Sequence, residues 1–189
     1  MENLHVSDNK RYLMKGSETF FWLADTGWLI FGNISEEEAY NYLKNRADKG
    51  FNVIQAVLVY STKELESVNK MYWGGADRIN DEEYWQHVER IIKMADKLGL
   101  YMALLPSWGS LLKNNLITSE NVLVYGRFLA ERLEKYSNII WVLGGDIKAD
   151  NYVEIYRKLG RYFKEKMPDK LITFHPFGRC ASSMWFADD

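Results

Sequence analysis

Apolar runs and helix-like segments alternate along this chain, and that alternation limits its fold more than any other feature. The runs are nearly continuous and rich in Val, Ile and Leu, as strands buried on both faces of a sheet are. Five of them lie at residues 20–24, 51–59, 100–105, 138–143 and 171–174. The segments between them carry apolar residues at helical spacing, at 35–49, 81–98, 118–133 and 151–167. Repeated strand–helix–strand units predict a parallel sheet with right-handed crossovers.

Characteristic residues mark the ends of the predicted helices. Ser35 is followed by three glutamates that end in Glu38, which predicts a capping box with acidic charge at the positive end of the helix dipole. Gly50 ends this first helix, Gly99 ends the second and Pro168 ends the last. The apolar stripes predict which helix residues face the sheet, among them Ala39, Leu43, Trp85, Val88, Ile91, Ile92, Ala95, Tyr125 and Leu129.

Two architectures fit this order of elements, an open doubly wound sheet and a (β/α)8 barrel. No glycine-rich phosphate-binding motif follows any strand. Candidate site residues follow every predicted strand, whereas in an open doubly wound sheet they would gather at one switch point. Residues 5–14 and 20–24 are predicted to be strands around a Lys15-Gly16-Ser17 turn, and such a hairpin suits the bottom of a barrel. We therefore expect an α/β fold of the (β/α)8 TIM-barrel type, truncated after about five βα units, with an N-terminal β-hairpin. Residues 1–189 form a single partial barrel domain in this interpretation.

Composition and charge exclude several classes of protein. With 47% hydrophobic and 26% charged residues over 189 positions, the chain is expected to bury a core rather than stay disordered. A net charge of −2 gives no reason to expect nucleic-acid or membrane-surface binding. No run approaches the ~18 apolar residues of a membrane span, and residues 1–10 lack the apolar core of a signal peptide. We expect a cytoplasmic protein, while export of a longer relative stays open.

Cysteine and histidine usage gives no sign of a disulfide or a metal site. Cys180 is the one cysteine, so no internal disulfide can form. His5, His87 and His175 are far apart in the sequence and make no paired ligand motif. We predict no metal site.

Polar or aromatic side chains follow each predicted strand. In a barrel the C-terminal ends of all strands meet on one face, where loops build the active site. The sharpest candidate is Asp146, because it follows an apolar strand and a Gly144-Gly145 kink where backbone can approach a ligand closely. A carboxyl group there can protonate a glycosidic oxygen, and aromatic faces suit sugar rings. The companions expected to bind such a substrate are Asp25, Trp28, Gln55, Trp108, His175 and Arg179.

Each of these residues also has a purely structural interpretation. Asp146 could cap the helix that follows it, although Asp150 lies closer to that helix. Asp25 could hydrogen-bond loop amides. Most of the aromatic residues, which make up 15% of the chain, are expected in the core, and Trp22 and Trp141 have core positions within their strands.

Five segments of the chain resemble the apiosidase-like glycoside hydrolases, which are (β/α)8 barrels akin to the cellulase-type clan. They are FFWLADTGW (20–28), RADKGFNVIQAV (46–57), GLYMALLPSWG (99–109), NIIWVLGGD (138–146) and LITFHPFGRCASSMWF (171–186). The segments occur in order with the expected element between each pair. The resemblance therefore covers nearly the whole chain.

The resemblance implies hydrolysis of a glycosidic bond in a plant-type polysaccharide, with apiose as a candidate product and no cofactor. It places the acid/base after the fourth strand, at Asp146, and a glutamate nucleophile after a seventh strand that these 189 residues do not reach. Two expectations follow. Either a second chain or self-association completes the barrel, or the chain is a non-catalytic carbohydrate-binding remnant.

Overall fold

A five-stranded parallel sheet forms the centre of the protein, with its strands in the order β4-β5-β6-β7-β8. The computed structural model describes residues 1–32, 34–60 and 82–187. The segment between the second predicted strand and the second predicted helix therefore lies outside the described residues from position 61 onward. The strands are β4 (Ala24–Thr26), β5 (Val53–Val57), β6 (Tyr101–Leu105), β7 (Ile139–Ile147) and β8 (Ile172–Pro176).

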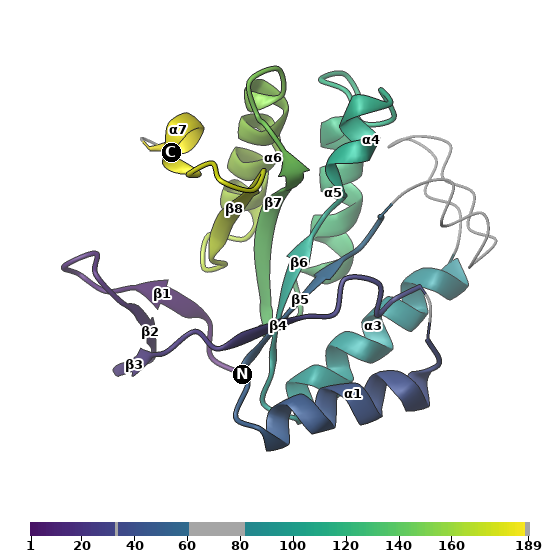
Figure 1. Cartoon of the computed structure of the whole chain (residues 1–189), viewed down its shortest axis with the longest axis vertical. Coiled ribbons are helices and arrows are strands. Elements are labelled where there is room, and N and C mark those ends of the chain that lie inside the picture. Colours follow the sequence, from purple (N-terminus) through teal and green to yellow (C-terminus); the bar gives the residue numbers. More distant parts are fainter. Residues whose placement is uncertain (33, 61–81, 188–189) are drawn as a thin grey trace.

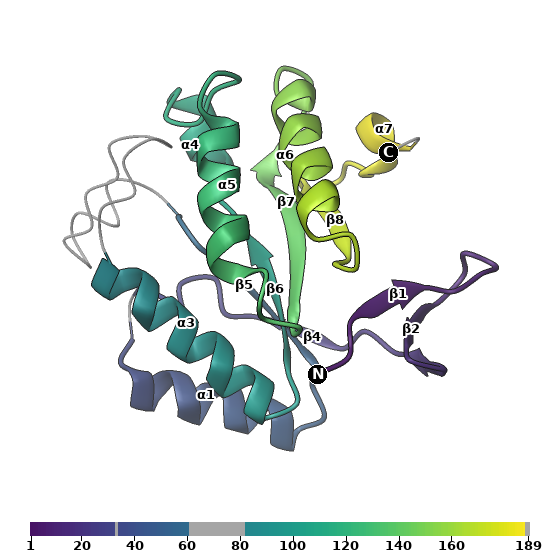
Figure 2. The same cartoon turned by 180° about the vertical axis from the view of Figure 1, so that it is seen from behind.

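Four long helices cover one face of this sheet. Those labelled α5 and α6 lie behind the strands in Figure 1 and in front of them in Figure 2, seen from the opposite side, while α1 and α3 lie side by side in the lower part of both views. They are α1 (Glu36–Asp48), α3 (Glu82–Lys97), α5 (Val122–Leu133) and α6 (Val153–Lys166), and two short helices, α4 (Gly109–Lys113) and α7 (Ser183–Phe186), add to them. This is the predicted βα order, with five parallel strands described where a complete (β/α)8 barrel has eight.

The sheet separates two apolar clusters, because successive side chains of a strand point to opposite faces. Between the sheet and the helices lies the larger cluster, which contains Trp85, Tyr125 and Trp141. The predicted inward residues of α3 and α5 are all buried there. The opposite face, which would be the barrel interior, carries a smaller cluster of Leu4, Val53, Val57, Tyr101, Ala103, Leu105, Ile140 and Val142.

The α1 capping box forms as predicted. The Ser35 side chain accepts a hydrogen bond from the Glu38 amide, and the Glu38 carboxylate accepts one from the Ser35 amide. The third long helix begins at Val122 rather than at position 118, because hydrogen bonds of the Asn121 side chain fix the backbone before it. This side chain accepts from the Thr118 amide and donates to the Leu116 carbonyl. No helix among the described residues is long and apolar enough to cross a membrane.

The N-terminal hairpin differs from the prediction. The segment predicted as one strand over 5–14 contains two, β1 (Leu4–Val6) and β2 (Leu13–Lys15), which pair antiparallel. Ser7 causes the break, since its hydroxyl accepts from the amides of Arg11 and Tyr12 and closes a turn. The predicted turn at Gly16 is present and leads to β3 (Glu18–Phe20).

The first barrel strand also lies elsewhere than at the predicted residues 20–24. It is β4, over residues 24–26, while residues 21–23 pair with no strand. Asn52 holds this segment with its side chain, which accepts from the Leu23 amide and donates to the Phe21 carbonyl. Side-chain hydrogen bonds thus replace strand pairing, and Asp25 falls inside the strand rather than after its end.

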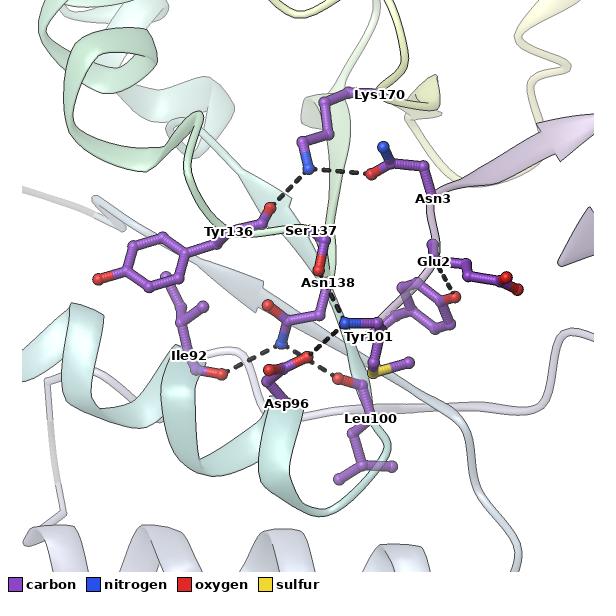
Figure 3. Close-up of polar contacts among 11 residues, drawn as sticks. Glu2, Asn3, Ile92, Asp96, Leu100, Tyr101, Tyr136, Ser137, Asn138 and Lys170 are labelled. Atoms are coloured by element: carbon purple, nitrogen blue, oxygen red, sulfur yellow. Dashed lines mark hydrogen bonds and ion pairs between the residues drawn. The ribbon is translucent and has the colours of Figure 1, made fainter. Parts of the chain in front are cut away.

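Polar contacts tie the N-terminal segment to the loops at the N-terminal end of the sheet (Figure 3). The buried Lys170 ammonium donates to the Asn3 side chain at 3.0 Å and to the Tyr136 carbonyl at 2.6 Å. Burial lowers the pKa of Lys170. The Tyr101 hydroxyl donates to the Glu2 carbonyl, and the Asn138 side-chain amide donates to the Ile92 carbonyl of α3 and to the Leu100 carbonyl just before β6. This end of the sheet is thereby closed by side chains.

Candidate active site

Asp146 lies in a bulge at the C-terminal end of β7. Gly144 pairs with His175 of β8, and the next pair joins Ile147 to Pro176. Gly145 and Asp146 are therefore two extra residues on β7 that have no partner on β8, an arrangement that redirects a side chain. The strand predicted to stop at 143 continues through this bulge to Ile147.

The two glycines allow this bulge because no other residue fits there. Gly144 and Gly145 have φ angles of +109° and +114°, which L side chains rarely adopt. A Cβ on Gly144 would lie 2.1 Å from the His175 carbonyl oxygen, and one on Gly145 would lie 2.9 Å from the Gly109 nitrogen. Strand β7 thus packs against both neighbouring segments without side chains at these positions. The predicted glycine kink is confirmed.

The carboxylate of Asp146 meets the imidazole of His175 across the bulge. The Asp146 Oδ1 and His175 Nε2 atoms are 3.0 Å apart, with the Asp146 side chain 55% exposed and that of His175 28% exposed. Asp146 does not cap the following helix, because α6 has Tyr152 as its N-cap and no side-chain cap bond. Asp150 is engaged elsewhere, as it accepts from the Trp185 indole at 2.7 Å.

Aromatic rings surround His175. The ring of Trp28, which follows β4, lies 5.5 Å from those of both His175 and Trp108, measured between ring centroids. Trp108, after β6, lies 6.0 Å from His175 and is stacked on Tyr60 at 5.1 Å. We call Trp28, Tyr60, Trp108 and His175 the aromatic cluster. Three of its members, Trp28, Trp108 and His175, are predicted site residues, while Tyr60 is not.

Gln55 and Arg179 lie outside these contacts. Gln55 belongs to the middle of β5 and shares its face with Val53 and Val57, so it lies on the interior side of the sheet below the cluster. Arg179 is exposed in the loop between β8 and α7, with a φ of +69°.

Asp25 faces α1 instead of the aromatic cluster. Its Oδ2 accepts from the Tyr42 hydroxyl at 3.0 Å and from the Arg46 guanidinium, and its Oδ1 accepts from the Thr26 amide. Burial by itself raises the pKa of Asp25, but these hydrogen bonds and the Arg46 charge outweigh it, so the pKa is lowered. The contribution of this carboxylate to stability is thus present above its ordinary pKa and lost as the pH falls. The partners of Asp25 are thus α1 side chains and an amide of its own strand, rather than the loop amides that the structural interpretation named.

The arrangement offers one exposed carboxyl group beside a ring that can donate or accept a proton, next to aromatic faces. No group of three His, Cys, Asp or Glu side chains that could hold a metal ion occurs in the described part of the chain. Proton transfer to a bound molecule is the chemistry that Asp146 and His175 support.

A family model, described as the apiosidase-like catalytic domain, matches residues 7–189. This chain belongs to the apiosidase-like family. The resemblance seen in the sequence is thereby confirmed. No curated protein matches the chain.

Two solved glycoside hydrolases are similar to this family member over nearly its whole length. One, a glycoside hydrolase family 5 protein from Bacteroides vulgatus, has 33% identity and a TM-score of 0.88, and the match covers 98% of this chain and 42% of that one. The other, titled glycoside hydrolase, has 34% identity and a TM-score of 0.88, with 99% and 44% covered. The chain spans less than half the length of either protein.

A more distant structure shows the fold alone. The endo-1,4-β-mannanase from Rhizomucor miehei has 9% identity and a TM-score of 0.69, and the match covers 90% of this chain and 60% of that one. The parallel sheet with its outer helices is thus the architecture of part of a (β/α)8 barrel, as in the two glycoside hydrolases to which the chain is similar.

Proposed function

We propose that this domain belongs to a glycoside hydrolase that acts on plant-type polysaccharide in the manner of an apiosidase, with Asp146 as general acid/base. The observation that carries the proposal is the position of Asp146, held by the β7 bulge at the C-terminal end of the sheet beside His175. Active sites of (β/α)8 barrels lie at this end. Family membership supplies the reaction class.

In the proposed reaction, the carboxyl group of Asp146 donates its proton to the oxygen of the leaving sugar as the glycosidic bond breaks. A second carboxylate stabilises or attacks the oxocarbenium-like centre, and no metal or organic cofactor takes part. Trp28 and Trp108 offer apolar ring faces for the sugar. Gln55, His175 and Arg179 would form hydrogen bonds with its hydroxyls, while Asp25, bound to α1, would act indirectly.

Leaving-group dependence tests the role of Asp146. In the Asp146→Asn variant of the protein with its barrel completed, we expect kcat on an unactivated glycoside to fall by about 100-fold or more, because the acid proton is missing. An aryl glycoside whose leaving group needs little protonation should lose much less. Asp150→Asn is the matched control. Equal turnover by Asp146→Asn and the unchanged chain on the unactivated substrate would refute the assignment.

A carbohydrate-binding domain without catalysis is the second candidate. It is favoured by Asp25, the other carboxylate predicted at a strand end, which is engaged with Tyr42 and Arg46. Glycosidic cleavage needs two carboxyl groups, so a site with one would bind and not cleave. Calorimetric binding of an oligosaccharide that is recovered intact would support this candidate over hydrolysis.

The domain is also proposed to work together with further polypeptide. Strand β8 pairs with β7 and forms one edge of the sheet in the described part of the chain, with Thr173 and His175 on its interior face. Polypeptide from a second chain or a second copy would pair with this edge and close the interior.

A further inference from the structure

The imidazole of His175 is fixed in place by groups on three sides. Its backbone pairs with Gly144 in the sheet, and the missing Cβ of that glycine lets the two strands approach. The rings of Trp28 and Trp108 lie 5.5 and 6.0 Å from it. Its Nε2 atom then lies 3.0 Å from Oδ1 of Asp146. The ring therefore presents its Nε2 atom to the Oδ1 atom of Asp146.

The chemistry of the two groups decides which of them donates. An ionised carboxylate only accepts hydrogen bonds, so the contact requires the proton of a neutral imidazole to be on Nε2. When the carboxyl group of Asp146 is protonated on Oδ2, its Oδ1 still accepts from the same N–H. The contact thus persists in both protonation states that an acid/base passes through, provided that the tautomer is fixed.

We propose that His175 is a positioning residue for Asp146, which as its Nε2–H tautomer holds Oδ1 and leaves Oδ2 to carry the transferred proton. This inference rests on the proposed function. Within the described part of the chain, the Asp146 side chain forms its hydrogen bond with His175. A carboxyl group that is 55% exposed rotates freely without such a partner, and proton transfer depends on its orientation.

A different arrangement of the same pair makes an opposite prediction. In a base dyad the carboxylate would orient the imidazole, and His175 itself would exchange the proton with the substrate. Glutamine separates the two roles, because its side-chain N–H can replace the Nε2–H donor but cannot take up a proton. His175→Gln should therefore preserve a positioning role and abolish a base role.

Nitrogen NMR of the 189-residue chain tests the contact without any substrate. We expect the neutral His175 ring to show a protonated Nε2 and an unprotonated Nδ1, and Asp146→Ala to shift it toward a mixture of tautomers. His87, on α3 and 3.8 Å from Glu36, is the control and should not respond. A proton on Nδ1, or a tautomer that does not change in Asp146→Ala, overturns the proposal.

Kinetics then test the consequence. His175→Ala should lower kcat on an unactivated glycoside by about 10- to 100-fold and spare the activated aryl glycoside, with KM little changed. His175→Gln should recover most of the loss, while His87→Ala has no effect. Equal losses in the Ala and Gln variants overturn the positioning role in favour of a base. If the tautomer is as expected but the chain hydrolyses nothing when combined with the polypeptide that closes its barrel, the positioning contact stands and the proposed function is refuted.

Discussion

Gly144 is the residue whose identity the geometry of the site restricts most strongly. A side chain there meets two independent penalties, a φ of +109° and a carbonyl oxygen 2.1 Å away from the Cβ position. The close approach joins β7 to β8, and so brings Asp146 to His175. Any substitution must move one of these strands.

Alanine at two glycines separates the two penalties. Gly144→Ala is expected to lower the free energy of unfolding by about 3 kcal/mol or more, because backbone must shift as well as adopt a strained φ. Gly50→Ala is the control, since Gly50 has a φ of +84° but nothing within 4 Å of its Cβ position. That variant should lose about 1 to 2 kcal/mol. Urea unfolding measures both, and equal losses would contradict the close approach.

The candidate site was predictable where a local pattern determines it. Asp146 follows two glycines after an apolar strand, and such a pattern needs no knowledge of neighbouring strands. The surroundings of Asp25 depend on where its strand begins. Strand β4 begins four residues later than predicted, and the Asp25 carboxylate points to Tyr42 and Arg46 on α1. No local sequence signal reveals this contact. The contact of Asp146 with His175 joins residues 29 positions apart and required the sheet order.

At the scale of elements, α1 depends on its N-terminal cap. Ser35→Ala removes the side-chain oxygen that accepts from the Glu38 amide, and we expect a loss of about 1 kcal/mol in the free energy of unfolding. Ser35→Asp should retain most of the stability, since aspartate caps as well as serine. The comparison is made by urea unfolding. An alanine variant as stable as the aspartate variant would mean that the cap contributes nothing.

Element types followed from the sequence better than element boundaries did. The helical period of α3 and α5 gave their buried faces because packing against one sheet imposes that period. The short strands β1 and β4 were misplaced because single side chains, Ser7 and Asn52, satisfy the backbone there. The two-residue bulge in β7 extended a strand that seemed to stop at its glycines.

At the scale of the whole molecule, the contacts made by the N-terminal segment predict a dependence on alkaline pH. Burial, and then the charges of Glu2 and Asp96, raise the pKa of Tyr101 to about 12. A tyrosine with a raised pKa stabilises the fold below its ordinary pKa of 10, and this is lost as the pH rises toward 12. The loss is worth about 2 to 3 kcal/mol.

Tyr101→Phe tests this dependence. The variant should be less sensitive to a rise from about pH 9 to about pH 11.5 than the unchanged chain, because phenylalanine does not ionise. Tyr12→Phe is the control, since Tyr12 is 54% exposed in the hairpin. Unfolding in urea at both pH values gives the two slopes. Identical slopes for Tyr101→Phe and the unchanged chain would contradict the assignment.

The edge at β8 predicts association. A cavity of about 690 Å³ lies between α6 and β8, with Leu143, Ile172 and Phe174 among the apolar side chains that line it and Arg157, Arg161 and Lys164 among the basic ones. We expect the 189-residue chain to self-associate in light scattering after size exclusion, because such an edge pairs with other strands. Thr173→Lys on β8 should reduce association, whereas Gln86→Lys on α3 should not. A stable monomer with a cooperative melt would contradict this expectation.

Release of sugar by the completed barrel tests the central claim most directly. The chain, combined with the polypeptide proposed to close its sheet, would be incubated with an apiose-containing plant polysaccharide, both unchanged and as the Asp146→Asn variant, and the products identified by mass spectrometry. The proposed function predicts that the assembly with the unchanged chain releases a sugar and that the assembly with the variant releases none. Binding of the polysaccharide with no release by either assembly would contradict it and favour the carbohydrate-binding alternative.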